Sequence, residues 1–189
     1  MIEDCLEIAK SSAIKEGLVL KTEKGNIKKL RFKDNEFDAV IAMRDVLNYC
    51  CKDYEEAFSE LVRVCKKNGI IAISCGSRYR MVLGKGIIER FGLKNLYYFV
   101  IKRKSFPTGE GFNHINFTVE ELKSLFKKFK VEILKISGDS IILPIIRSNV
   151  AKIFSDKKNV ELIKQIDKFL SKDECNLNFF DHIIVIGKK

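Results

Sequence analysis

Apolar and polar positions divide the first part of the chain into short elements. Apolar residues at helical spacing predict a helix over residues 1–16, and Gly17 follows as a stop signal. A short strand is predicted over residues 18–22. Residues 25–35 form an irregular polar segment with a turn.

Two apolar runs joined by a helix give the clearest pattern in the chain. Residues 38–43 predict a strand that is apolar on both faces, as in a parallel sheet covered by helices. Residues 54–66 predict an amphipathic helix, with Gly69 as a left-handed cap. Residues 70–74 predict a second buried strand. This alternation predicts an α/β fold with parallel strands.

The second half of the chain is less regular. Residues 78–113 mix aromatic and charged residues, which we interpret as helical segments with a loop at 107–111. Thr118 and Glu121 form a capping-box pattern, which predicts a helix over 117–129. The remaining elements expected are a strand over 131–137, a mostly helical region over 141–170 and a final strand over 179–187.

Length and composition favour one folded domain. The chain has 189 residues, 46% of them hydrophobic, and only two prolines. That is enough apolar material for a core, and no linker rich in proline, glycine or serine divides the sequence. We therefore expect a single domain over 1–189 with an inserted lid region over 78–113.

The net charge of +10 makes nucleic acid a candidate partner. The lysines are scattered rather than gathered into a tail, so a solvated lysine-rich surface explains them more simply. The six cysteines include no Cys-x-x-Cys pair and there are two histidines, so we expect no metal site. Free thiols without a signal peptide favour the cytoplasm, and no apolar run is long enough to suggest a membrane partner.

Residues 25–43 and 60–74 resemble the middle of class I S-adenosylmethionine-dependent methyltransferases, of the type that acts on small molecules. Phe37-Asp38-Ala39-Val40-Ile41-Ala42-Met43 resembles the fourth strand of that fold. Weaker likenesses lie at 114–122, after the lid, and at 181–189, the last strand. The resemblance implies a Rossmann-like sheet, mostly parallel with an antiparallel last strand, in the family order 3-2-1-4-5-7-6.

The resemblance also implies where S-adenosylmethionine would bind. The family's turn that touches the adenine matches Gly25-Asn26, where asparagine keeps an acceptor but loses the charge. A plain turn at Asn26 is an equally good interpretation. The cofactor-binding residues implied in this way are Gly25, Asn26, Ile27, Met43, Arg44 and Val46.

The same resemblance implies candidate residues for binding the methyl acceptor, called acceptor-binding residues below. They are Asn48, Tyr49, Tyr79, Arg80 and His114. Core packing explains Tyr49 equally well, and a bond to the loop backbone explains His114 better than a catalytic role. Glu60 and Arg63 are interpreted as a structural pair, and His182 as structural. No catalytic residue is assigned.

The family's glycine-rich loop and first two strands have no counterpart in this sequence. Without them, residues 18–22 would lack a pairing strand and residues 38–43 would present an unpaired apolar edge. We therefore expect a misassigned start, a truncated product, or half of a split protein whose missing strands come from a partner chain.

The leading functional hypothesis is methyl transfer from S-adenosylmethionine to a small molecule. In-line transfer needs positioning and desolvation more than a dedicated acid or base. A non-catalytic fragment or interaction module completed by another chain is the first alternative. An RNA methyltransferase is the second, because of the charge. A nicotinamide dehydrogenase is disfavoured, since no dinucleotide fingerprint occurs.

Overall fold

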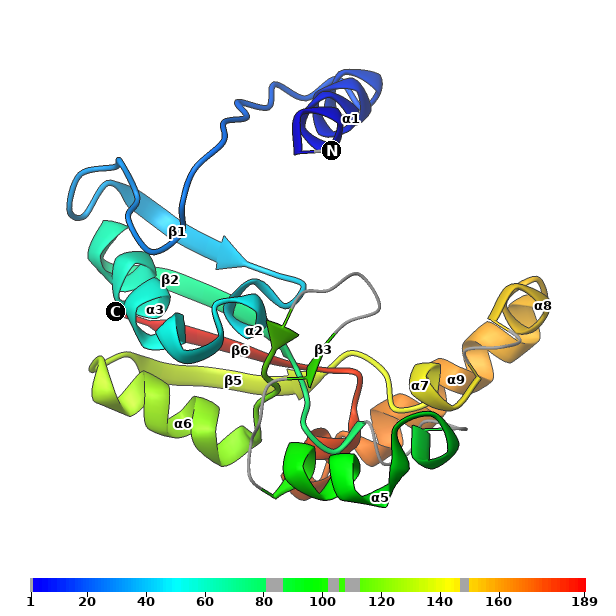
Figure 1. The fold of residues 1–189 in the computed structure, drawn as a ribbon. Coiled ribbons are helices and arrows are strands. Elements are labelled where there is room, and N and C mark those ends of the chain that lie inside the picture. The colour runs from blue at the N-terminus through cyan, green and yellow to red at the C-terminus, as the bar shows by residue number, and fades with distance from the viewer. Residues whose placement is uncertain (1, 81–86, 102–105, 108–112, 147–149) are drawn as a thin grey trace.

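The centre of the molecule is a four-stranded sheet with strand order β1-β2-β6-β5 (Figure 1). The computed structural model describes residues 2–80, 87–101, 106–107, 113–146 and 150–189. The strands are β1 (Phe37–Ala42), β2 (Cys65–Gly76), β5 (Glu132–Gly138) and β6 (His182–Lys188). β1 and β2 run parallel, whereas β6 is antiparallel to both β2 and β5.

This topology confirms an α/β fold with a mixed sheet. Across the sheet, the order β1-β2-β6-β5 takes the places that the family order gives to strands 4, 5, 7 and 6. β1, β2 and β5 run in the same direction and β6 alone runs opposite to them, which confirms the expected mostly parallel sheet with an antiparallel last strand. β6 inserts between β2 and β5, so both of its pairings are antiparallel.

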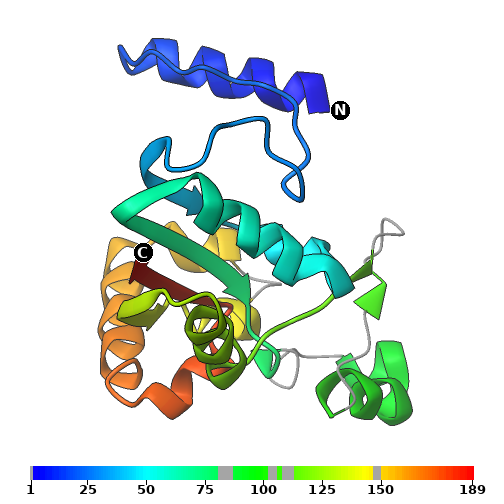
Figure 2. The ribbon, with the colours of Figure 1, turned by 90° about the vertical axis from the view of Figure 1, so that its left-hand side faces the viewer.

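Helices α2, α3 and α6 lie together on one side of this sheet (Figures 1 and 2). The helices and short strands are α1 (Ile2–Lys15), α2 (Val46–Tyr49), η1 (Cys51–Asp53), α3 (Tyr54–Val64), α5 (Ile87–Val100), β3 (Phe106–Pro107), β4 (Asn113–His114), α6 (Val119–Lys128), α7 (Leu143–Ile146), α8 (Val150–Phe154), α9 (Lys157–Leu170) and η3 (Glu174–Phe179). In the part of the chain that the structure describes, no helix is both long and apolar enough to cross a membrane.

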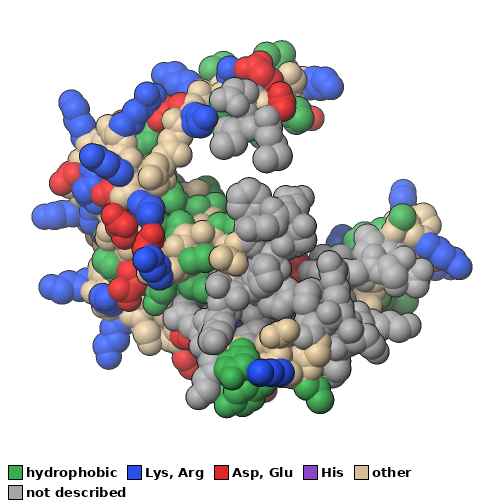
Figure 3. Space-filling model, viewed as in Figure 1, with side chains coloured by type: hydrophobic (Ala, Val, Ile, Leu, Met, Phe, Trp, Pro, Cys, Tyr) green, Lys and Arg blue, Asp and Glu red, His purple; other side chains and the backbone are tan. Residues whose placement is uncertain are grey.

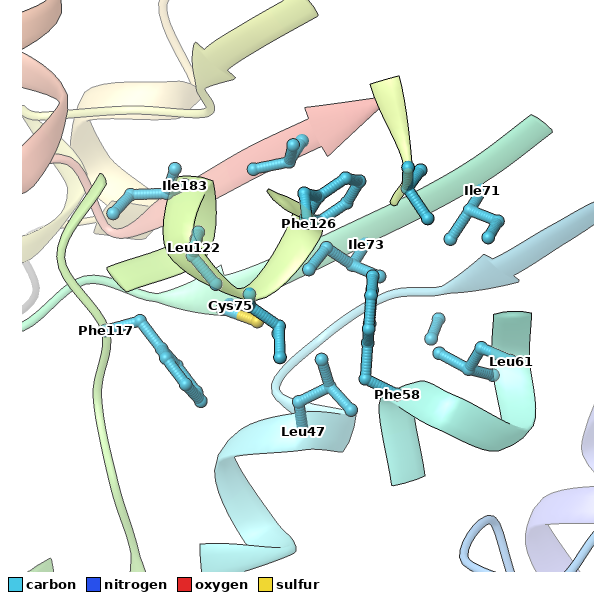
Figure 4. Packing of buried hydrophobic residues seen from close by; sticks show 14 of the residues in the cluster. Leu47, Phe58, Leu61, Ile71, Ile73, Cys75, Phe117, Leu122, Phe126 and Ile183 are labelled. Atoms are coloured by element: carbon cyan, nitrogen blue, oxygen red, sulfur yellow. The ribbon is translucent and has the colours of Figure 1, made fainter. Parts of the chain in front are cut away.

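The core lies between the sheet and helices α3 and α6 (Figure 4). Alternate residues of β2, namely Ile71, Ile73 and Cys75, are fully buried, as expected for a strand with one face against helices. Phe58 of α3 and Phe126 of α6 meet there with ring centroids 4.9 Å apart. These two rings join the two helices over the centre of the sheet.

The sequence predicted two local signals at helix ends, the capping box at Thr118 and the cap at Gly69, and the structure bears out the first. Thr118 accepts a bond from the Glu121 backbone and donates its own N–H to the Glu121 carboxylate, which confirms the predicted capping box. The predicted left-handed cap at Gly69 is wrong, because Asn68 takes that conformation instead with φ 64°. Asparagine tolerates this region better than other residues with a Cβ. Gly69 serves a different need: a Cβ there would lie 2.7 Å from the Cys65 sulfur.

The strand predicted over residues 18–22 does not form. These residues connect α1 to the rest of the chain as irregular backbone, and Val19 is 96% exposed. Strands need a neighbour for their hydrogen bonds, and α1 with its connection stands apart from β1 in both ribbon views (Figures 1 and 2). β1 is an edge strand of the sheet formed by the described residues.

The predicted lid region over 78–113 contains α5, β3 and β4. Residues 81–86, 102–105 and 108–112 lie outside the described residues, and the loop expected at 107–111 falls almost wholly among them. The division into one domain with a lid therefore stays a prediction.

Candidate functional site

The carboxyl ends of the parallel strands β1 and β2 meet at one edge of the sheet, and the chain makes an unusual turn there. Arg44 and Asp45, directly after β1, both have left-handed backbones, with φ 62° and 65°. Such a conformation is uncommon outside glycine and persists only where the surroundings fix it. Here Ser74 of β2 does so: its hydroxyl accepts a bond from the Arg44 N–H at 2.9 Å, and its carbonyl accepts one from Asp45 at 3.3 Å.

The Asp45 side chain joins this turn to β2 and β6. Its Oδ1 accepts a 2.6 Å bond from the N–H of Gly76, the last residue of β2. Its Oδ2 lies 3.3 Å from Nε2 of His182, the first residue of β6, and 3.8 Å from Nη2 of Arg80. One carboxylate therefore connects three segments that are distant in the sequence.

His182 is buried and lies at the centre of a network of charged side chains. Its Nδ1 is 3.0 Å from Asp139 and 3.3 Å from Asp181, while Nε2 faces Asp45. Burial alone would lower the pKa of His182, but bonds with Asp139, Asp181 and Asp45 raise it to about 11. Burial raises the pKa of Asp45, and the opposing effects of His182 and Arg80 bring it below its ordinary value. The network therefore holds an imidazolium against carboxylates at neutral pH.

Three of these residues are also close enough to share a metal ion. Ligand atoms of Asp139, Asp181 and His182 all lie within 4.8 Å of one another. A histidine must give up a proton to bind a metal, however, whereas these carboxylates stabilise the protonated ring. The arrangement therefore fits an ion-pair network better than a metal centre.

Asn48, predicted as an acceptor-binding residue, is fully buried beside the same edge. Its side-chain amide donates to the Gly76 carbonyl at 3.3 Å and to Oδ1 of Asn116 at 3.0 Å. Its backbone carbonyl accepts a 3.0 Å bond from Ile115. Asn48 thus ties α2 to the end of β2 and to the segment that leads into α6.

Tyr49 and His114, two further predicted acceptor-binding residues, lie next to each other. Their ring centroids are 6.1 Å apart with planes tilted by 46°. Tyr49 is 54% exposed, whereas His114 is buried. The exposure of Tyr49 disfavours the alternative that it is a core residue. The structure therefore brings together one accessible ring and one sheltered ring beside the carboxyl edge.

Tyr79 and Arg80 are held by the segment that precedes β6. The Tyr79 ring lies 5.6 Å from that of Phe179, and its N–H donates to the carbonyl of Asn178. Arg80 donates from Nη1 to the Asp181 carbonyl at 2.9 Å and to its carboxylate at 3.1 Å. Through these contacts and its proximity to Asp45, Arg80 positions the turn after β1.

The turn at Gly25-Asn26, predicted to contact the adenine, is exposed. The Asn26 side-chain oxygen accepts a 3.0 Å bond from the backbone of Lys28, and Lys28 forms a 2.7 Å ion pair with Asp53 in η1. The plain-turn geometry is thus present. An amide oxygen has two lone pairs, so this bond leaves one available to a ligand.

Arg63 fixes the segment between this turn and β1. It pairs with Glu60 at 2.6 Å and donates to the backbone carbonyls of Leu30 and Phe32 at 3.0 and 2.8 Å. Glu60 in turn accepts a bond from the Leu30 N–H. This confirms Glu60 and Arg63 as a structural pair, which anchors the segment after the Gly25-Asn26 turn to α3.

A surface cavity of about 250 Å³ lies between α3 and α6, away from these residues. Its lining is Tyr54, Glu55, Glu120, Glu121, Ser124, Leu125 and Lys128. None of the predicted cofactor or acceptor residues takes part in it. We therefore locate the candidate site at the carboxyl edge of β1 and β2 instead.

Comparison with known proteins finds a family model that matches part of the chain. Residues 1–73 match the family model described as a methyltransferase domain. A crystal structure of an S-adenosylmethionine-dependent methyltransferase from Methanosarcina mazei superposes with a TM-score of 0.59 at 18% identity. It covers 98% of this chain, and this chain covers 77% of it. The chain has the methyltransferase fold.

Two further structural comparisons show whether the methyltransferase fold determines the reaction. A Clostridium acetobutylicum S-adenosylmethionine-dependent methyltransferase gives a TM-score of 0.54 at 15% identity, covering 98% of this chain and 71% of its own. The [4+2]-cyclase SpnF gives 0.57 at 18% identity, covering 97% and 62%. SpnF is named for a different reaction, so the fold alone does not determine the chemistry.

Relatives in sequence match a little over a third of this methyltransferase-fold chain. An uncharacterized protein of Mycobacterium tuberculosis is 36% identical over 70 residues. The match covers 37% of this chain and 25% of the relative. The chain therefore aligns with about a quarter of the length of that protein.

Proposed function

We propose that this chain takes part in S-adenosylmethionine-dependent methyl transfer and forms one wall of the cofactor site at the carboxyl edge of β1 and β2. The observation that carries the proposal is the left-handed turn at Arg44 and Asp45. Ligands of open α/β sheets bind outside the carboxyl ends of the strands, and backbone strain gathers at functional sites. The match over residues 1–73 to the methyltransferase domain includes this turn.

The residues on this edge fit one side of the cofactor. Met43 is 41% exposed and offers apolar surface, and the exposed Arg44 offers a cation for the carboxylate of the methionine part. Asn26 offers its second lone pair to the adenine amino group. Ile27 and Val46 are partly buried apolar side chains that would add apolar surface for the ring. When bound, the cofactor supplies an electrophilic methyl group on a sulfonium.

A small-molecule acceptor would lie against Tyr49 and His114. The exposed Tyr49 ring provides a flat surface and a hydroxyl, and His114 lies behind it. Asn48 holds the turn of α2 in place through Gly76, and Arg80 holds Asp45. These roles are positioning, which is what in-line transfer requires most.

An RNA acceptor is a second candidate because of the net charge of +10. The two acceptors differ in their response to salt. Phosphate contacts release counterions, so RNA binding would weaken steeply as salt is added, whereas binding of a neutral small molecule would not.

Asn26 gives the sharpest test of the proposal. Calorimetric titration of S-adenosylmethionine would compare the 189-residue chain with Asn26→Asp, Asn26→Ala and a control, Gln165→Ala, on the exposed surface of α9. Aspartate keeps the acceptor that the Lys28 backbone uses and adds charge, so Asn26→Asp should bind about fivefold tighter and Asn26→Ala about fivefold weaker. Equal affinities for wild type and Asn26→Asp, or no binding by any of them, would contradict the proposal.

A further inference from the structure

Asn116, two residues after His114, is a buried polar residue outside the set predicted to bind cofactor or acceptor. It is 2% exposed. Its side-chain Oδ1 accepts a 3.0 Å bond from Nδ2 of Asn48, and its backbone carbonyl accepts one from Arg78 at 3.4 Å. Its side-chain Nδ2 is buried as well, and it has no hydrogen-bond partner among the residues that the structure describes. Buried amide groups are normally satisfied, so this donor requires an explanation.

The hydrogen bonds of Asn48 determine which atom of the Asn116 amide is left over. The Gly76 backbone presents one N–H and one carbonyl to Asn48, whose Oδ1 accepts from the first and whose Nδ2 donates to the second, each at 3.3 Å. The other hydrogen on Nδ2 of Asn48 is directed to Asn116, which must meet it with oxygen. The amide of Asn116 is therefore oriented by the fold, and its nitrogen is the donor that remains.

The segment around Asn116 is fixed against the carboxyl edge of the sheet. Ile115 donates its N–H to the Asn48 carbonyl, and Phe117 donates its N–H to the Gly76 carbonyl, both at 3.0 Å. The side chains of Ile115 and Phe117 belong to the hydrophobic core. Since successive side chains of an extended segment alternate between its two sides, Asn116 lies on the side opposite to these core residues.

His114, two positions earlier, shares that side of the segment with Asn116. The His114 ring lies 6.1 Å from the ring of the exposed Tyr49, and these two rings form the surface against which we propose that the acceptor lies. The remaining donor of Asn116 therefore belongs to the same side of the segment as the proposed acceptor surface.

The chemistry of the amide nitrogen limits what it can bind. An amide N–H is a donor, so the ligand atom that meets it must have a lone pair. Carboxylate and hydroxyl oxygens have one at neutral pH, whereas an aliphatic amine is protonated there and offers only donors. Hydrogen bonds to an ionised group are about twice as strong as those between neutral groups. Asn116 therefore suits ligands that carry oxygen, and acids most of all.

The charge of the molecule favours the same class of ligand. The chain carries a net charge of +10, and lysine and arginine side chains project around much of the outline of the space-filling view (Figure 3). A positive potential raises the local concentration of anions. Long-range attraction thus brings an acid to the molecule, while the buried donor acts only at short range and gives the orientation.

We infer that Asn116 is a specificity-determining residue whose side-chain N–H donates to a carboxylate or hydroxyl oxygen of the methyl acceptor. The inference rests on the proposed function for naming the ligand a methyl acceptor, and it deepens that function by giving the chemical class. A site built to hydrogen-bond one group rejects analogues that lack it, because the buried donor is then left without a partner.

The test uses the 189-residue chain and three probes of similar shape, namely benzoate, benzyl alcohol and benzylamine. Benzylamine is a cation at neutral pH and has no lone pair to offer. The side-chain amide of Asn116 gives its own signals in a nitrogen–proton correlation spectrum, which are assigned by their loss in Asn116→Asp. Benzoate and benzyl alcohol should shift these signals saturably, with benzoate binding the tighter, and benzylamine should leave them unchanged.

Two variants separate recognition of the oxygen from support of the fold. Asn116→Asp keeps an oxygen for the Asn48 amide but replaces the donor by an acceptor, whereas Asn116→Leu removes both at a similar shape. At pH ~8, Asn116→Asp should bind benzoate at least about tenfold more weakly and benzylamine about fivefold more tightly than wild type, which reverses the preference. Asn116→Leu should weaken benzoate without a gain for benzylamine.

Asn159→Asp is the matched control for this change of an amide to a carboxylate. The Asn159 amide, in α9, already donates to the Ile153 carbonyl at 3.3 Å. This variant should bind all three probes as wild type does. Circular dichroism checks that the variants are folded, and the Asn116 signals of wild type give a result that does not depend on their folding.

Unchanged Asn116 signals at saturating benzoate would overturn the inference, as would the absence of saturable binding or equal losses for all three probes in Asn116→Asp. The same spectra report the proposed function separately. Shifts at residues 43–46 with S-adenosylmethionine, but none at Asn116 with benzoate, would contradict this inference alone. Shifts at Asn116 with benzoate, but none at 43–46 with the cofactor, would contradict the proposed function and still confirm the class of ligand.

Discussion

Nε2 of His182 lies 3.3 Å from Oδ2 of Asp45 although 137 positions separate the two residues. The contact joins the start of the last strand to the turn that follows the first. Because Asp45 also accepts a bond from Gly76, the ion pair fixes the carboxyl edge of both parallel strands at once. The geometry of the candidate site therefore depends on a network outside the residues that would contact a ligand.

The protonation of His182 gives a prediction on pH. Its pKa is raised to about 11 in the folded chain, against an ordinary value of about 6.5 in the unfolded one. The stabilisation is therefore complete below pH ~6.5 and is lost as the pH rises toward ~11, because only the folded state then keeps the proton. Urea unfolding of wild type between pH ~6.5 and ~9.5 should show stability falling with pH, and His182→Gln should show a flatter profile. Parallel profiles for the two proteins would contradict this.

Gly76 should tolerate no side chain at the end of β2. A Cβ there would lie 2.8 Å from Nη2 of Arg80 and 2.8 Å from Oδ1 of Asp45. Gly76→Ala should lower the free energy of unfolding by about 1–3 kcal/mol, the usual cost of overpacking. Gly25→Ala is the control, since a Cβ there meets nothing within 4 Å and should change stability little. Urea denaturation of both variants measures the difference.

The core between α3 and α6 gives a prediction about stability alone. Phe58 is fully buried and packs against both Phe126 and Phe129. Phe58→Ala should therefore cost about 3–5 kcal/mol. Leu134→Ala, at a position that is 51% exposed, should cost far less. Similar losses for the two variants would show that this cluster is not the core.

The cysteines should react in a fixed order with a thiol reagent. Cys5 and Cys175 are exposed, Cys50 and Cys51 are half-buried, and Cys65 and Cys75 are buried. Burial raises the pKa of the Cys50, Cys51, Cys65 and Cys75 thiols, which lowers the thiolate fraction that reacts. Fast labelling at Cys5 and Cys175 is expected, with Cys65 and Cys75 labelled only after unfolding. Mass spectrometry of a labelling time course identifies the sites, and early labelling of Cys75 would contradict the described burial.

Local sequence signals predicted the elements whose stability is local. The capping box of Thr118 and Glu121 and the apolar runs of β1 and β2 were sufficient to predict these elements. The strand expected over residues 18–22 failed because a strand depends on a neighbour, which no local pattern reveals. The left-handed backbone near the start of β2 was predicted at Gly69, but the preceding residue, Asn68, has it.

In the candidate site too, local sequence signals did not reveal contacts between residues that are distant in the sequence. Tyr49 and His114 were expected near a substrate from the resemblance, and the structure brings their rings together. Arg80 was also expected there, but its partners Asp45 and Asp181 are distant in sequence. The role of Asp45 was missed, although its position directly after a buried strand was a usable signal. The contacts of His182 had no such signal, because they arise only when the sheet closes.

The most direct test of the central claim is to map S-adenosylmethionine on the chain by amide chemical-shift changes in a nitrogen–proton correlation spectrum. The account predicts shifts that cluster at residues 25–27 and 43–46, the turn and the carboxyl edge of β1, while α9 is unaffected. Shifts confined to the cavity between α3 and α6, or no shifts at saturating cofactor, would contradict a cofactor wall at the edge of β1 and β2.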